Sequence, residues 1–152
     1  MTTKFNVRLD PPFQTGALNE DFFIDLPHMN DEQKKALAKF IEKTTNGAPL
    51  PGKNKPSHLD DNLGKIPQTD LYEEGNYWHY HCGPSYSNPT NPSLTFNLGI
   101  NLNGATSAEV IHYIKSKENE DDITIVAYSP KHTPFPNSDS EDNPLFCDAD
   151  EE

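Results

Sequence analysis

Alternating hydrophobic and polar positions predict a strand close to the start of the chain. In residues 4–9, the side chains of Phe5, Val7 and Leu9 share one side of an extended backbone, and a pair of prolines soon ends the pattern. This spacing is typical of a half-buried strand.

Four further segments in the second half of the chain are predicted as strands. Residues 77–82, 110–115 and 123–128 are rich in aromatic and β-branched side chains, which favour extended backbone. The polar residues 118–121 between the last two segments predict the tip of a hairpin. Residues 94–102 alternate strictly, and their apolar positions are Leu94, Phe96, Leu98, Ile100 and Leu102.

Helical periodicity is clearest after Asn30. Asn30 and Gln33 have the spacing of a capping box, and Gly47 is a natural helix stop. An apolar stripe follows the cap at helical spacing and consists of Ala36, Leu37, Phe40 and Ile41. We expect this helix to pack its stripe on a sheet and to present its lysines to solvent or to a ligand.

The order of these segments indicates an α+β fold. Residues 48–70 and 84–93 are rich in proline and glycine and predict long loops, which are often functional. We therefore expect an antiparallel sheet of four to five strands with one main helix packed on it. Residues 1–136 are predicted to form a single domain, and residues 137–152 a flexible acidic tail.

Composition and charge limit the classes of function that fit the sequence. The chain has 152 residues, two cysteines and a net charge of −12, whereas nucleic-acid binders are usually basic. No charged and apolar leader opens the printed sequence, and no apolar run has membrane-spanning length. We expect a soluble, cytoplasmic protein without a membrane partner.

The charge is unevenly distributed along the sequence. The predicted tail has seven acids and no basic residue, so the rest of the chain has 12 basic against 17 acidic residues. Between residues 34 and 65 the sign reverses, with seven lysines and three acids. Such an asymmetry can form a basic patch on an acidic protein, although a solvated helix face and loop explains it at least as well.

The densest aromatic and histidine stretch covers residues 76–84. In a strand, His79 and His81 share one face, whereas Tyr80 and Cys82 lie on the other, and the sequence leaves open which face meets the core. Two histidines on one face can share a metal if a third ligand joins them, but a buried structural histidine is the commoner outcome. The histidines available as a third ligand are His58, His112 and His132.

The last predicted strand leads into Lys131 and His132. A lysine beside a histidine suits phosphate chemistry, because the lysine supplies a cation and the histidine can move a proton near neutral pH. An exposed loop with a path fixed by prolines is an equally good interpretation. The sequence contains no glycine-rich phosphate loop and no Gly-x-Ser-x-Gly motif.

The arrangement resembles bacterial toxins of the RelE/ParE superfamily, and among them the YafO-type toxins. Three pieces of sequence carry the resemblance: the helix segment with Lys39 and Lys43 that runs into the Pro- and Gly-containing loop at residues 47–51, the strand with His79 and His81, and the closing hairpin that leads into Lys131. Together they span residues 31–136.

The resemblance implies a small α+β fold, ribosome-dependent cleavage of mRNA without a cofactor or metal, and neutralisation by a cognate antitoxin. The implied reaction is attack of an RNA 2′-hydroxyl on the adjacent phosphate. The implied catalytic residues are either His79 or His81 together with His132 as base and acid, Lys131 as phosphate clamp, and Tyr80 or Tyr128 for stacking or proton relay. The implied RNA-binding residues are Lys39, Lys43, Lys53, Lys55 and Lys65.

A second class of function fits the acidic composition. An immunity protein or antitoxin-like inhibitor would use acidic residues to cover a basic toxin or nuclease, steered by electrostatic complementarity. Its histidines would be structural. Substitution of histidines or of Lys131 would then matter little, whereas neutralising acids would weaken binding.

Overall fold

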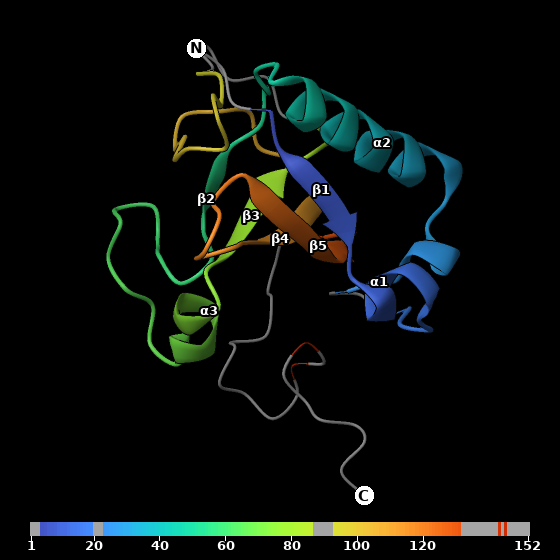
Figure 1. The fold of residues 1–152 in the computed structure, drawn as a ribbon, viewed down its shortest axis with the longest axis horizontal. Helices are drawn as coiled ribbons and strands as arrows, with labels where there is room; N and C mark the ends of the chain where they lie inside the picture. Colours follow the sequence, from blue (N-terminus) through green and yellow to red (C-terminus); the bar gives the residue numbers. More distant parts are fainter. Residues whose placement is uncertain (1–3, 20–22, 87–92, 132–142, 144, 146–152) are drawn as a thin grey trace, which may run out of the picture.

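The computed structural model describes residues 4–19, 23–86, 93–131, 143 and 145. Five strands form one sheet in the order β1-β5-β4-β3-β2. The elements in chain order are β1 (Asn6–Leu9), α1 (Pro11–Thr15), the 3₁₀ turn η1 (Leu26–His28), α2 (Asp31–Asn46), β2 (Asn54–Pro56), α3 (Asp70–Glu74), β3 (Tyr77–His81), β4 (Val110–Lys115) and β5 (Asp122–Ser129). Figure 1 shows the long helix α2 lying along the sheet. None of the helices in the described part of the chain is long and apolar enough to cross a membrane.

The predicted α+β class is confirmed, but the expected purely antiparallel sheet is wrong. Strand β1 runs parallel to β5, with Val7 opposite Ile123, whereas β2, β3, β4 and β5 pair antiparallel in sequence. Strands β4 and β5 are antiparallel because the short connection at residues 116–121 reverses the chain, whereas long loops join β2 to β3 and β3 to β4. Strand β1 is far from its partner β5 in the sequence, with α1, α2 and the other strands between them. The hydrophobic pattern of β1 shows which of its faces is buried, but it does not show whether β1 runs parallel or antiparallel to β5.

Helix α2 forms where the sequence predicts it. Both bonds of the capping box are present: the Gln33 backbone N–H donates to Asn30 Oδ1, and the Asn30 backbone N–H donates to Gln33 Oε1, each at 2.8 Å. Gly47 ends the helix in the left-handed conformation at φ 73°, which glycine adopts without steric cost. The buried Phe40 ring lies 5.2 Å from the ring of Tyr80, so the apolar stripe of α2 covers β3.

The predicted strand at residues 94–102 is wrong. The predicted alternation of buried and exposed positions is not found: the polar Thr95 and Asn101 are buried, Phe96 is 56% exposed, and Leu98 is the buried one of the five apolar positions. Asn97 and Leu98 both have positive φ, so the backbone turns where the strand would continue. In place of a strand ladder, isolated bridges such as Leu50 to Thr95 pair the backbone of this segment with the rest of the chain.

A buried asparagine holds this turn against the sheet. Asn54 in β2 is fully buried, and its Nδ2 donates to the carbonyl oxygens of Leu98 at 3.1 Å and Gly99 at 3.0 Å. The Tyr113 hydroxyl donates to Asn54 Oδ1 at 2.6 Å. The side chain therefore links β2, β4 and the 94–102 turn through polar atoms that have no access to water.

Two residues of the predicted acidic tail pack on the folded body. Asn143 is buried, and its Nδ2 donates to the hydroxyl of Tyr72 at 2.9 Å. Leu145 packs against a cluster that contains Phe23 and Ala127. The predicted boundary at residue 136 thus does not separate these two side chains from the domain.

Substitution of Asn54 tests the buried link. Asn54→Ala removes the partners of the Gly99 carbonyl and the Tyr113 hydroxyl, so the free energy of unfolding should fall by about 2–4 kcal/mol in urea denaturation. Asn6→Ala is the control, because Asn6 makes one exposed side-chain bond, and it should cost no more than about 0.5 kcal/mol. Equal effects of the two substitutions would contradict this role of Asn54.

Candidate functional site

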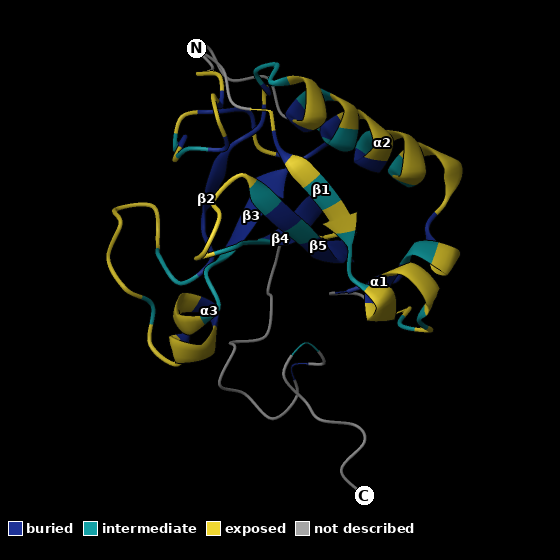
Figure 2. Cartoon of the chain, viewed as in Figure 1, coloured by how far each residue is buried: buried dark blue, intermediate teal, exposed yellow. Residues whose placement is uncertain are grey.

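Strand β3 divides the aromatic and histidine stretch between the two faces of the sheet. Trp78, Tyr80 and Cys82 join the hydrophobic cluster under α2. His79 and His81 project from the opposite face, because successive side chains of a strand alternate. Successive residues of β3 and β4 are buried, and β3 is coloured mostly as buried in Figure 2, so both faces of these strands are covered. The polar half of the stretch is therefore as inaccessible as the apolar half.

Strand β4 adds a third histidine to this face. His112 is the direct partner of His79, and the ring centroids of the two residues lie 6.2 Å apart. The rings of His79 and His81 lie 5.9 Å apart. All three side chains are at most 3% exposed. We call His79, His81 and His112 together the histidine face.

Each histidine ring contacts a serine. Ser57 Oγ lies 3.2 Å from His79 Nδ1, and Ser129 Oγ lies 2.7 Å from His112 Nε2. His81 Nδ1 lies 3.1 Å from the backbone nitrogen of Ser107 and 3.0 Å from its carbonyl oxygen. That nitrogen can accept from the N–H when it is unprotonated and donate to the carbonyl when it is protonated, so both states have a partner.

Two lysines flank the histidine face. Lys55 in β2 is the direct partner of His79, and the backbone N–H of His81 donates to the carbonyl of Lys53 at 2.9 Å. Both lysine side chains are nearly buried, and both Nζ atoms donate to Asp61 Oδ1, at 2.6 Å from Lys53 and 2.7 Å from Lys55. The hydrogen bond from Lys53, followed in size of effect by the hydrogen bond from Lys55, lowers the pKa of Asp61 to about 2. Two cations thus share one carboxylate beside the histidines.

The other predicted RNA-binding lysines lie elsewhere. Lys39 and Lys43 belong to α2, on the far side of the sheet from the histidine face. Lys65 is exposed and pairs with Asp70 and Glu73, which raise its pKa. Of the five lysines, the structure brings only Lys53 and Lys55 to the predicted histidines.

The predicted tyrosines are also separated from the histidines. Tyr80 and Tyr128 are buried in the cluster under α2, and the Tyr80 hydroxyl accepts from the backbone N–H of Gly52 at 2.9 Å. Lys131 is exposed two residues beyond Ser129, which contacts His112. His132 lies outside the described residues.

The sequence alone did not single out the serines or Asp61. Ser57 and Ser107 lie outside the predicted strands, and no local pattern links them to a histidine 22 or 26 residues away. His112 is part of a predicted strand, but only the register of β3 on β4 places it beside His79. Within the described residues, no group of three His, Cys, Asp or Glu side chains is placed to hold a metal ion.

Comparison of the chain with protein-family models, with curated proteins and with solved structures finds no match.

The shared carboxylate gives the stability of the protein a defined pH dependence. The pKa of Asp61 is about 2 in the folded chain and near 3.8 without partners, so its stabilising effect is complete above about pH 5 and is lost as the pH falls to 2. The difference in unfolding free energy between the natural chain and Asp61→Asn should be constant from about pH 7 to 5 and should shrink below about pH 5. Urea denaturation at each pH measures it, and a difference that does not change down to pH 2 would contradict this pairing.

Proposed function

We propose that the chain is an endoribonuclease of the bacterial toxin class and that its histidine face performs the proton transfers. The observation that carries the proposal is the placement of two histidines on β3 directly beside two lysines on and next to β2. These residue types are the base, the acid and the cations that the reaction needs. The resemblance of residues 31–136 to RelE/ParE toxins supports the same function.

The proposed reaction needs two proton transfers at one phosphate. A base takes the proton of the RNA 2′-hydroxyl as the oxygen bonds to phosphorus, and an acid gives a proton to the 5′-oxygen as its bond to phosphorus breaks. Histidine suits both roles because its usual pKa is near neutral. The ring centroids of His79 and His81 lie 5.9 Å apart, close enough for both imidazoles to reach the same phosphodiester.

Lys53 and Lys55 would stabilise the extra negative charge that the phosphate acquires during attack. Both lysine side chains are nearly buried although Asp61 is exposed, and near a partly desolvated site a cation acts more strongly on a nearby anion than it does in water. Asp61 fixes the positions of both ammonium groups, since each donates to the same carboxylate oxygen. The proposal assigns no RNA contact to Lys39, Lys43, Lys65, Tyr80 or Tyr128.

Substrate must displace part of the protein to reach this site. The ring of Phe23 meets the ring of His112 edge-on with 5.1 Å between centroids, and Leu145 packs against the cluster that contains Phe23. We propose that Phe23 and Leu145 move away from this face when the protein meets mRNA on the ribosome. A cognate antitoxin would neutralise the enzyme in the cytoplasm.

Induced expression of the chain in a bacterium tests the proposed function. Growth and protein synthesis should stop promptly, and His79→Ala or His81→Ala should remove the effect, because loss of a proton-transfer group costs about 10²–10⁴ in rate. His28→Ala is the matched control: it removes an exposed histidine outside the sheet and should leave the arrest intact.

Cleavage of a ribosome-bound mRNA gives the chemical control. A single 2′-deoxynucleotide at the cleaved position should block the cut, because it removes the nucleophile. Unimpeded growth at high soluble yield, or an arrest that survives both histidine substitutions, would contradict the proposal. Unimpeded growth would favour the acidic inhibitor, for which neutralising acids should weaken capture of a basic partner.

Deletion of residues 137–152 tests whether the packing of Leu145 limits access of RNA to the histidine face. The deletion removes seven acids and the packing of Leu145, so binding of a short single-stranded RNA by the free protein should strengthen by about tenfold at low salt. Fluorescence anisotropy measures the change, with an Asn143→Ala/Leu145→Ala chain to separate packing from charge. Unchanged affinity in both variants would contradict a covering role.

A further inference from the structure

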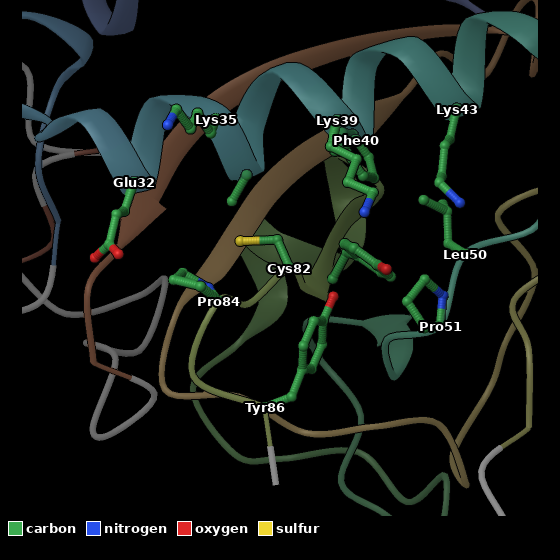
Figure 3. A pocket seen from close by; sticks show the side chains of 12 residues that line it. Glu32, Lys35, Lys39, Phe40, Lys43, Leu50, Pro51, Cys82, Pro84 and Tyr86 are labelled. Carbon is green, nitrogen blue, oxygen red and sulfur yellow. The ribbon is translucent and has the colours of Figure 1, made fainter. Parts of the chain in front are cut away.

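A second site lies on the other side of the sheet, between α2 and the end of β3. It is a cavity of about 450 Å³, within the size range of sites for small ligands. Figure 3 shows α2 along its upper edge and the turn after β3 along its lower edge. The lining residues are Glu32, Lys35, Ala36, Lys39, Phe40, Lys43, Leu50, Pro51, Tyr80, Cys82, Pro84 and Tyr86.

A row of three lysines borders this cavity. Lys35, Lys39 and Lys43 are spaced every four residues on α2, so their backbone positions follow one another at steps of about 6 Å along one side of the helix. Glu32 is the single acidic residue of the lining. None of the three lysines has an ion-pair partner among residues 4–19, 23–86, 93–131, 143 and 145. Cations without partners at the mouth of a cavity attract an anion, even on a protein of net charge −12.

The interior of the cavity is mainly apolar, with one polar group directed into it. Phe40, Leu50 and Pro84 supply hydrocarbon surface. The Tyr86 hydroxyl is hydrogen-bonded to the hydroxyl of Tyr80 and points into the cavity in Figure 3. Such a lining can bind the body of a small molecule by burying its apolar surface and can orient it through one hydroxyl.

The thiol of Cys82 does not act as a nucleophile in this cavity. Burial raises the pKa of Cys82 far above its usual value, and its Sγ donates to the carbonyl of Gly83 at 3.3 Å. A protonated thiol behaves as a small apolar surface. The cavity therefore has the features of a binding site.

We propose that this cavity binds a small organic anion with an apolar or aromatic body. The body would lie between Phe40, Leu50 and Tyr86, and its carboxylate or phosphate would lie against Lys39 and Lys43. The limited volume favours a small molecule over a peptide or a nucleic-acid strand. The site shares no residue with the histidine face, so this inference stands apart from the proposed ribonuclease function.

A fluorescence titration of the full chain with 8-anilinonaphthalene-1-sulfonate, an apolar aromatic sulfonate, tests the inference. Emission should rise to saturation with one dye per chain. Lys39→Ala/Lys43→Ala should weaken binding at least about tenfold, since two cation contacts are lost. Lys34→Ala is the matched control: it lies on the same helix outside the cavity and should bind normally.

Two competitors identify the class of anion. Displacement of the dye by decanoate would support a carboxylate with an aliphatic body, and displacement by adenosine monophosphate would support a phosphate with an aromatic body. Phe96→Ser shows whether the dye lies on the exposed apolar turn instead. Dye binding that survives the double lysine substitution, disappears in Phe96→Ser, or resists both competitors would overturn the inference.

Discussion

Successive side chains of β3 point to opposite faces of the sheet, and both of those faces are buried. Tyr80 packs against Phe40 of α2 on one side, while His79 and His81 occupy the other. The neighbours of β3 obey the same division, because directly paired residues share a face: His112 and Lys55 accompany the histidines, and Tyr113 and Asn54 accompany the core. One strand thus separates a hydrophobic core from a layer of titratable side chains.

Burial of the histidine face and of the lysines beside it costs folding free energy. A buried polar group without a hydrogen-bond partner costs about 1–3 kcal/mol, and a buried charge costs more. Here each imidazole contacts a serine, and the two nearly buried lysines share the carboxylate of Asp61. An apolar layer could cover the same face without such partners, so a specific role for these groups is the simplest reason for their presence.

The sequence predicts local structure better than it predicts which residues meet. The caps of α2 and the apolar runs of β4 and β5 are local features, and the structure confirms them. The direction of β1 depends on a distant partner, and the pattern of residues 94–102 misleads because Thr95 and Asn101 make hydrogen bonds in the interior.

The same limit applies to the two sites. Alternation in β3 correctly separates His79 and His81 from Tyr80, and this separation removes Tyr80 from any site that the histidines form. The seven lysines of residues 34–65 look like one basic patch in the sequence. The fold divides them, however: Lys39 and Lys43 border the cavity under α2, Lys53 and Lys55 join the histidine face, and Lys65 pairs with carboxylates.

The most direct measurement of the central claim is an NMR titration of the histidine side chains with a short RNA that carries a single non-cleavable 2′-deoxynucleotide. The imidazole resonances of His79 and His81 should shift as RNA is added, while those of the exposed His28 should stay in place. If the resonances of both His79 and His81 stay unchanged, RNA does not bind at the histidine face, which would contradict the proposed function.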